Sequence, residues 1–113
     1  MNYSELQEEI TSTLDRMEEN SKRWPIARAE YDKMQDMKKI TLNVIADGID
    51  AKTSAEKDRK AYKSKKYLDY INKCFDVSIE HYAAQAEKEF LHDKLEALRS
   101  QLSFEKNMLE LTK

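Results

Sequence analysis

Basic and aromatic side chains gather in one short stretch of the chain, residues 57–73. This stretch holds seven Lys and Arg against two acidic residues, whereas residues 1–56 hold 8 against 12 and residues 74–113 hold 5 against 8. Basic side chains neutralise backbone phosphates, and aromatic rings stack on unpaired bases. The pattern therefore predicts a surface for single-stranded DNA, made by Arg59, Lys60, Tyr62, Lys63, Lys65, Lys66 and Lys73.

The same stretch also has a simpler interpretation as the solvated side of a long helix. On one continuous helix, Arg59, Tyr62 and Lys66 share a flank with Tyr70 and Lys73. A lysine-rich turn on such a flank is typical of a helix face that only meets water, and tyrosines on its inner side are typical of a core. Both interpretations stay open at the level of sequence.

Other residues with reactive side chains indicate packing. Cys74 and His81 lie seven residues apart, about 10 Å along a helix, which is too far for shared metal bonds of about 2.0–2.3 Å. His81 and His92 have no Ser, Asp or Cys in a pattern that marks a nucleophile with its base. The chain has one Gly, so no glycine-rich phosphate loop exists. We expect no metal, no cofactor and no enzymatic activity.

The elements that must position these residues are helices. Ala, Glu, Lys, Leu and Arg make up 53 of the 113 residues, and one Gly and one Pro leave little turn chemistry for a sheet. The predicted class is all-α, a coiled-coil-like helical bundle with short N-terminal helices and one long C-terminal helix. The length predicts a single domain over residues 1–113.

Two shorter helices are expected first, over about residues 5–24 and 26–47. Ser4 and Gln7 have capping-box spacing at the start of the first helix. Pro25 is expected to end or kink that helix, and Gly48 is the expected left-handed stop of the second. Their apolar stripes comprise Leu6, Ile10, Leu14 and Met17, then Ala27, Tyr31, Met34, Met37, Ile40 and Val44.

A long helix is expected over about residues 54–113. Thr53 and Glu56 form a second capping box, and no Gly or Pro follows Ser54. A bend, if present, is expected near Ser100 and Ser103.

Apolar residues of the long helix recur in heptads and predict a coiled-coil-like seam. The apolar face also widens beside this seam, through Leu68, Ile71, Phe75, Ile79, Tyr82 and Phe90. Two short helices cannot cover so wide a face, so we expect a homo-oligomer. The predicted oligomer seam is Tyr67, Tyr70, Cys74, Val77, Leu91, Leu95, Leu98 and Leu102.

The apolar runs are only a few residues long, and the acidic N-terminus lacks the pattern of a signal peptide. We therefore expect a protein without a membrane partner, located in the cytoplasm. The single cysteine, Cys74, cannot form an internal disulfide and fits a reducing compartment.

Several segments occur in an order found in small helical phage proteins. They are "LQEEI" near the start, Trp24 after "SK", "SKKYLDY" in the lysine-rich middle and "KLEALRSQLSFEKNM" in the tail. In this order the chain resembles the UvsY-type recombination mediators of the T-even phages. The resemblance implies a helical oligomer in the bacterial host cytoplasm that binds single-stranded DNA and helps a recombinase displace the single-strand-binding protein.

The resemblance carries over only to the basic segment, with Arg59, Lys63, Lys65, Lys66 and Lys73 as phosphate contacts. The chain departs from this family in its tail, which has few basic residues. The resemblance therefore does not extend a DNA surface to the tail. Two functions from different classes thus remain: a non-catalytic accessory protein of recombination or replication that binds single-stranded DNA, and a helical adaptor or assembly factor that binds only protein.

Overall fold

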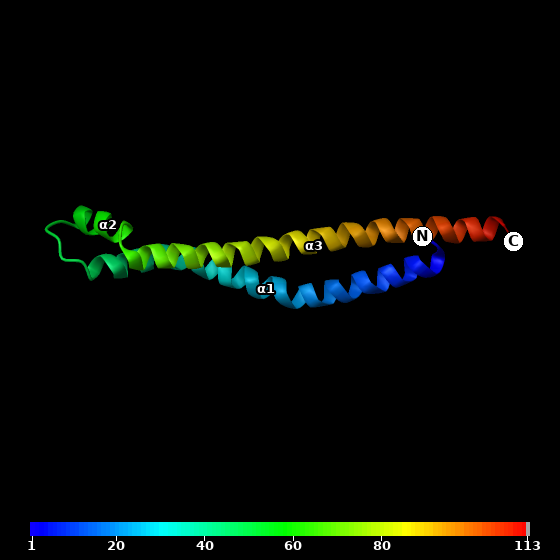
Figure 1. Ribbon diagram of the computed structural model, residues 1–113, viewed down its shortest axis with the longest axis horizontal. Helices are drawn as coiled ribbons and strands as arrows, with labels where there is room; N and C mark the ends of the chain where they lie inside the picture. The colour runs from blue at the N-terminus through cyan, green and yellow to red at the C-terminus, as the bar shows by residue number, and fades with distance from the viewer. Residues whose placement is uncertain (113) are drawn as a thin grey trace. The chain divides into compact units, whose positions relative to one another are not determined.

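The computed structural model describes residues 1–112, which form three α-helices and no strand. These are α1 (Tyr3–Asp47), α2 (Ser54–Tyr62) and α3 (Lys65–Leu111) (Figure 1). The predicted all-α class with a long C-terminal helix is confirmed. Lys113, the end of the predicted long helix, lies outside the described residues. None of the described helices has a segment both long and apolar enough to cross a bilayer.

Asn2 caps the start of α1. Its Oδ1 accepts a hydrogen bond from the Glu5 amide at 2.8 Å, and its Nδ2 donates to Glu5 Oε1 at 3.1 Å. Asn is a favoured N-cap residue, and this reciprocal pair resembles a capping box. The capping box predicted at Ser4 and Gln7 is wrong, because Asn2 supplies the cap two residues earlier.

α1 continues through Pro25 as one helix of 45 residues, so the prediction of two separate helices meeting at Trp24 is wrong. A proline inside a helix removes one backbone hydrogen bond and crowds the preceding turn, at a cost of about 3 kcal/mol. The helix is packed on both sides of this position, since Asn20 is 5% exposed and Ala27 is 3% exposed. This packing outweighs the single lost bond.

The end of α1 lies at Asp47, beside the predicted stop at Gly48. Within residues 1–112 no residue has a positive φ, so the predicted left-handed glycine is wrong. Instead, the Gly48 amide donates to the Ile45 carbonyl at 3.2 Å, and the Ile49 amide donates to the Ala46 carbonyl at 3.0 Å. These bonds span three residues and tighten the helix end as a 3₁₀ turn.

Ser64 divides the predicted long helix into α2 and α3. Its Oγ donates to the Ala61 carbonyl at 2.7 Å and accepts from the Tyr67 amide at 3.2 Å, so one side chain closes the first helix and caps the second. The break is therefore at Lys63–Ser64, while Ser100 and Ser103 lie inside α3. The cap of α2 is as predicted, because Thr53 Oγ1 accepts from the Glu56 amide at 3.1 Å.

The described chain forms two compact units, which we call unit 1 and unit 2. Unit 1 contains Met1–Pro25 and the chain from Ala83 onward. Its segments of α1 and α3 run antiparallel, since Glu9 pairs with Lys94 at 3.3 Å and Arg16 pairs with Glu87 at 3.3 Å. Its core contains Leu6, Thr13, Asn20, Ala84, Leu91, Leu95 and Leu98.

Unit 2 contains Ile26–Tyr82, with the rest of α1, all of α2 and the first part of α3. Its buried residues are small or polar: Ala27, Ala46, Ala61, Cys74 and His81. The apolar area removed from water is therefore modest, because each buried alanine contributes far less than a leucine. The interpretation of residues 1–113 as a single domain stays a prediction.

Four of the five buried residues of α1 recur at seven-residue intervals: Leu6, Thr13, Asn20 and Ala27. This is the spacing of a coiled-coil seam, but two of the four are polar. The apolar stripes predicted for the N-terminal helices are wrong in part, because they follow exposed residues instead. The fractional exposures are 44% at Leu14, 38% at Met37, 54% at Ile40 and 66% at Val44.

All eight residues predicted for the seam of the long helix are buried or half-buried within one chain. Leu91 is fully buried, and Leu95 and Leu98 are each 5% exposed. A second chain would reach these leucines only if the chain's own helices moved away. A homo-oligomer stays a prediction, and it needs a surface other than this one.

Candidate nucleic-acid interface

The predicted DNA-binding residues lie around the junction of α2 and α3, all within unit 2. Arg59, Lys60 and Tyr62 are on α2, Lys63 is its C-cap, and the other three lysines are on α3. All seven are exposed. The single-helix flank proposed from the sequence is wrong, because the break at Ser64 places its members on two helices.

The α2–α3 junction brings basic charge to two helix ends with opposite dipoles. Arg59 and Lys60 lie in the last turn of α2, where cations are favoured, and Lys60 also pairs with Glu56 at 3.5 Å. Lys65 and Lys66 open α3, whose first turn has no acidic residue. Cations at a helix N-terminus are unfavourable unless an anion is nearby, and the amides there are suited to phosphate.

Tyr62 is the aromatic side chain most exposed at this junction. Its ring makes an edge-to-face contact with Tyr67, with centroids 5.1 Å apart and planes at 80°, while 56% of Tyr62 is exposed. Tyr67 itself is half-buried, and burial, with the nearby Tyr62, raises the pKa of its phenol. Tyr67 therefore supports the exposed ring of Tyr62, which has the surface needed to stack on a base.

Lys73 differs from the other basic residues. It lies seven residues beyond Lys66 on α3 and lines a shallow depression of about 430 Å³ together with Asp69, Tyr70, Asn72 and Asp76. The two carboxylates occupy positions four before and three after Lys73, which are neighbours on a helix. They offset its charge, so we assign the interface to this junction cluster: Arg59, Lys60, Tyr62, Lys63, Lys65 and Lys66.

Tyr70, predicted for the seam, holds α1 and α3 together in unit 2. Its hydroxyl donates to the Met34 carbonyl at 2.8 Å. Burial raises the pKa of its phenol, and a hydrogen bond with Cys74 acts in the same direction. The folded state therefore favours the neutral phenol, which is the form that donates to the carbonyl.

We expect the Tyr70→Phe variant to lose about 0.5–1.5 kcal/mol of stability at neutral pH, the usual net contribution of one hydrogen bond. A phenol whose pKa is raised by folding stabilises the fold below about pH 10, and this contribution is lost as the pH rises through the folded pKa. The variant should therefore show a smaller alkaline loss than wild type. Urea unfolding across pH 7 to about 11 measures both effects.

The matched control is Tyr62→Phe, which removes a hydroxyl from an exposed ring. This control should leave the neutral-pH midpoint almost unchanged. An alkaline loss of equal size in wild type and Tyr70→Phe would contradict the assigned role of Tyr70.

An aromatic cluster in unit 2 contains the buried histidine His81. Tyr31 stacks on His81, with centroids 4.4 Å apart and planes at 15°, and its hydroxyl lies 3.2 Å from that of Tyr82. The hydrogen bond with Tyr82 raises the pKa of Tyr31. His81 thus packs against rings, in line with the packing role expected for it from the sequence. In the described residues, no group of three or more His, Cys, Asp or Glu is placed to hold a metal ion.

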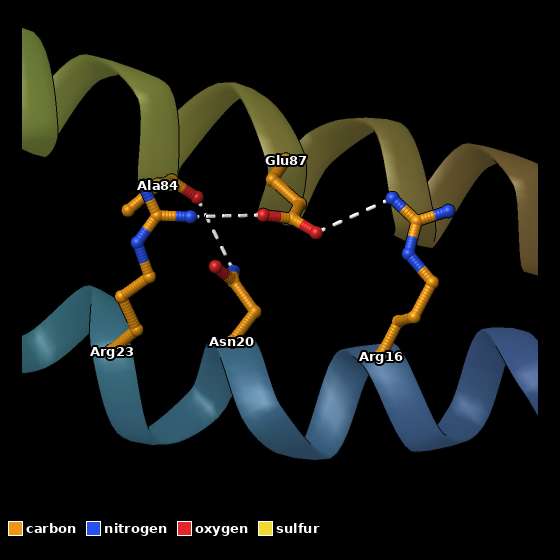
Figure 2. A network of polar contacts seen from close by, with 5 residues as sticks. All are labelled: Arg16, Asn20, Arg23, Ala84 and Glu87. Carbon is orange, nitrogen blue, oxygen red and sulfur yellow. Dashed lines mark hydrogen bonds and ion pairs between the residues drawn. The ribbon is translucent and has the colours of Figure 1, made fainter.

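A polar network in unit 1 joins α1 to α3 (Figure 2). Glu87 accepts from Arg16 at 3.3 Å and from Arg23 at 3.1 Å, and between these arginines Asn20 Nδ2 donates to the Ala84 carbonyl at 3.2 Å. Sequence reasoning missed this network, although Arg16 and Arg23 are one heptad apart and flank Asn20. That spacing was the available signal.

Beside this network lies a mostly apolar cavity of about 360 Å³, also in unit 1. It is lined by Met17, Asn20, Ser21, Trp24, Pro25, Lys88 and Leu91. The ammonium of Lys88 is 3.9 Å from the centre of the Trp24 ring, which is a cation–π contact. Trp24 therefore packs between the two helices next to Pro25.

The fold and the junction cluster define an all-helical protein with a small basic, tyrosine-bearing surface. The chain matches no protein-family model, no curated protein and no solved structure.

Proposed function

We propose that this protein is a non-catalytic, single-stranded-DNA-binding accessory protein. The observation that carries the proposal is the junction cluster: five exposed basic side chains and one exposed tyrosine lie between residues 59 and 66, where α2 ends and α3 begins. Charge of this kind binds phosphates irrespective of sequence, and one ring can stack on any base. In the role that the resemblance to recombination mediators implies, it would assist a recombinase against the single-strand-binding protein.

The test is binding of a fluorescent oligonucleotide at several salt concentrations. If four phosphates are contacted per protomer, the logarithm of the binding constant should fall with the logarithm of salt at a slope of about −2.8. Replacing Arg59, Lys63 and Lys66 by Ala should flatten this slope by about 2, because each single-strand contact contributes roughly 0.7. Tyr62→Ala should cost about 1–3 kcal/mol of binding with the slope unchanged.

The matched control replaces three exposed basic residues of unit 1, Lys22, Arg99 and Lys106, by Ala. This variant has the same net charge as the junction variant, so it separates a local surface from general attraction. Equal slopes in the two variants would contradict the assignment to the junction. Absence of binding by wild type at about 50 mM salt would overturn the DNA-binding proposal altogether.

The second candidate function is a helical adaptor that binds only protein. The observation in its favour is the number of large apolar side chains left exposed on α3, among them Phe75, Phe90 and Phe104 at 65%, 56% and 63%. Soluble monomers seldom expose a contiguous apolar patch larger than a few hundred Å². If the oligonucleotide experiment gives no binding, this function takes the place of the first.

A further inference from the structure

A cavity lies beside the junction cluster, between the end of α1 and the start of α3 in unit 2 (Figure 1). Its volume is about 350 Å³, within the roughly 300–1,000 Å³ that is usual for ligand pockets. The proposed function assigns DNA to the exposed side chains of the junction cluster and leaves this cavity without a role.

The wall of the cavity that comes from α1 and its end is aliphatic. It is formed by Val44 and Ile45 in the last turns of the helix and by Ile49 just beyond it. Ile45 and Ile49 are half-buried, and 66% of Val44 is exposed. Such a wall favours an apolar or planar group, because contact with it removes apolar area from water.

The start of α3 adds positive charge to the cavity. Lys65 and Lys66 line it, and no acidic residue is among its lining residues. Ser64, the one uncharged polar side chain of the lining, already makes two hydrogen bonds, with the Ala61 carbonyl and the Tyr67 amide. The cavity therefore combines an apolar wall with two cations, which suits a ligand that has a planar apolar part and an anionic part.

A nucleotide of single-stranded DNA has both parts. Its base has flat faces, which proteins hold between aromatic or apolar side chains when a base leaves the stack. Its phosphate is an anion that lysine neutralises. Lys65 and Lys66 belong both to the cavity and to the junction cluster, so a strand whose phosphates contact the cluster brings its bases to this cavity.

We infer that the cavity takes up one base of the bound strand, against Val44, Ile45 and Ile49, while Lys65 and Lys66 hold the neighbouring phosphates. The inference rests on the proposed function and deepens it, since it adds a second base site to the exposed ring of Tyr62.

Gly48 provides the variant that obstructs the cavity. It lines the cavity, and a Cβ added there would meet only the Ile45 carbonyl oxygen, at 3.5 Å, which is an ordinary van der Waals contact. Its φ is not positive, so a side chain causes no backbone strain. Replacing a glycine at such a position also reduces the freedom of the unfolded chain. Gly48→Ala and Gly48→Leu should therefore keep the helicity of wild type.

Binding of a fluorescent DNA oligonucleotide measures the effect of obstruction. Gly48→Leu should bind on the order of 10-fold more weakly than wild type, as for the loss of one base contact, and Gly48→Ala should fall in between. The salt slope should be that of wild type, because no charge is removed. The control Ala97→Leu places a leucine at an exposed position of unit 1 and should bind as wild type does.

A second variant changes the chemistry of the cavity and not its space. Val44→Asn makes part of the aliphatic wall polar at an exposed position, so folding should be unaffected. It should weaken binding severalfold, again with the salt slope unchanged, and it decides the matter if Gly48→Leu loses helicity.

An oligonucleotide of the same length made of stable abasic nucleotides identifies the group that enters the cavity. It keeps the phosphates and lacks the bases, so wild type, Gly48→Leu and Val44→Asn should all bind it equally. Equal weakening of the two variants on the normal and the abasic oligonucleotide would overturn the inference, because the substitutions would then act on the phosphate contacts.

Folded Gly48→Leu and Val44→Asn variants that bind the normal oligonucleotide as wild type does would also overturn the inference. The proposed function would then hold with the junction cluster alone. Absence of binding by wild type at about 50 mM salt would instead remove the proposed function, and the inference with it.

Discussion

The Leu91→Asp variant is expected to lose most of its helical circular dichroism at 25 °C. Leu91 is fully buried in the core of unit 1. Removing such a leucine costs about 2–5 kcal/mol, and an unpaired buried carboxylate adds several more. This total is comparable to the roughly 5–15 kcal/mol by which whole domains are stable. Far-ultraviolet circular dichroism during urea titration measures the loss.

Leu109→Asp is the matched control for this prediction. Leu109 continues the heptad series of Leu95 and Leu102, so sequence spacing alone places it in the seam, yet it is 52% exposed. The control should therefore unfold within about 0.5 kcal/mol of wild type. If both variants lost their helicity, Leu109 would be buried in the seam, as its heptad position predicts, and not exposed. If neither did, the core of unit 1 would be misplaced.

The Asn20→Leu variant is expected to be more stable than wild type by about 1–3 kcal/mol. Asn20 is 5% exposed and donates to the Ala84 carbonyl, but its Oδ1 has no hydrogen-bond partner. A leucine of similar size removes this unpaired acceptor and adds apolar contact. Thermal unfolding should shift upward by several degrees, at about 4–8 °C per kcal/mol for domains of 60–100 residues.

Asn20→Ala is the comparison that identifies the cause. It removes the amide without filling its space, so a gain from removal of the unpaired acceptor is offset by the cavity. We expect no stabilisation in this variant. A lower melting temperature for Asn20→Leu than for wild type would show that the Asn20 amide stabilises unit 1 despite its unpaired oxygen. A buried polar residue in a seam commonly fixes the register of its helices. The leucine variant should therefore also show a wider spread of backbone amide hydrogen-exchange rates than wild type.

The helical class and the inner face of α3 were accessible from sequence because they depend on composition and periodicity. The heptad positions at Leu91, Leu95 and Leu98 are apolar, and each is buried. The seam of α1 was not accessible in this way, because Thr13 and Asn20 occupy two of its positions. Asn20 donates to the Ala84 carbonyl of α3, and Thr13 Oγ1 donates to the Glu9 carbonyl of its own helix, and neither bond follows from an apolar periodicity.

Helix ends were harder to predict than helix faces. Pro25 disfavours a helix locally, yet packing before and after it keeps α1 continuous. Ser64 ends one helix and starts another, although the surrounding sequence has no Gly or Pro. At Pro25 a local preference of about 3 kcal/mol is outweighed by tertiary packing, whereas at Ser64 the local hydrogen bonds of one serine side chain end one helix and start the next. The basic segment was identified correctly as exposed, but its arrangement depended on that break.

Trp24, the only tryptophan of the chain, lies in unit 1, whereas five of the six tyrosines lie in unit 2. Excitation at wavelengths that only the indole ring absorbs therefore reports on unit 1, whereas tyrosine emission comes mostly from unit 2. Because the ammonium of Lys88 lies 3.9 Å from the Trp24 ring, separation of α1 from α3 should change the indole emission at once. The native protein thus carries two intrinsic optical labels, and comparing their transitions during denaturation shows whether the two units melt together or in sequence.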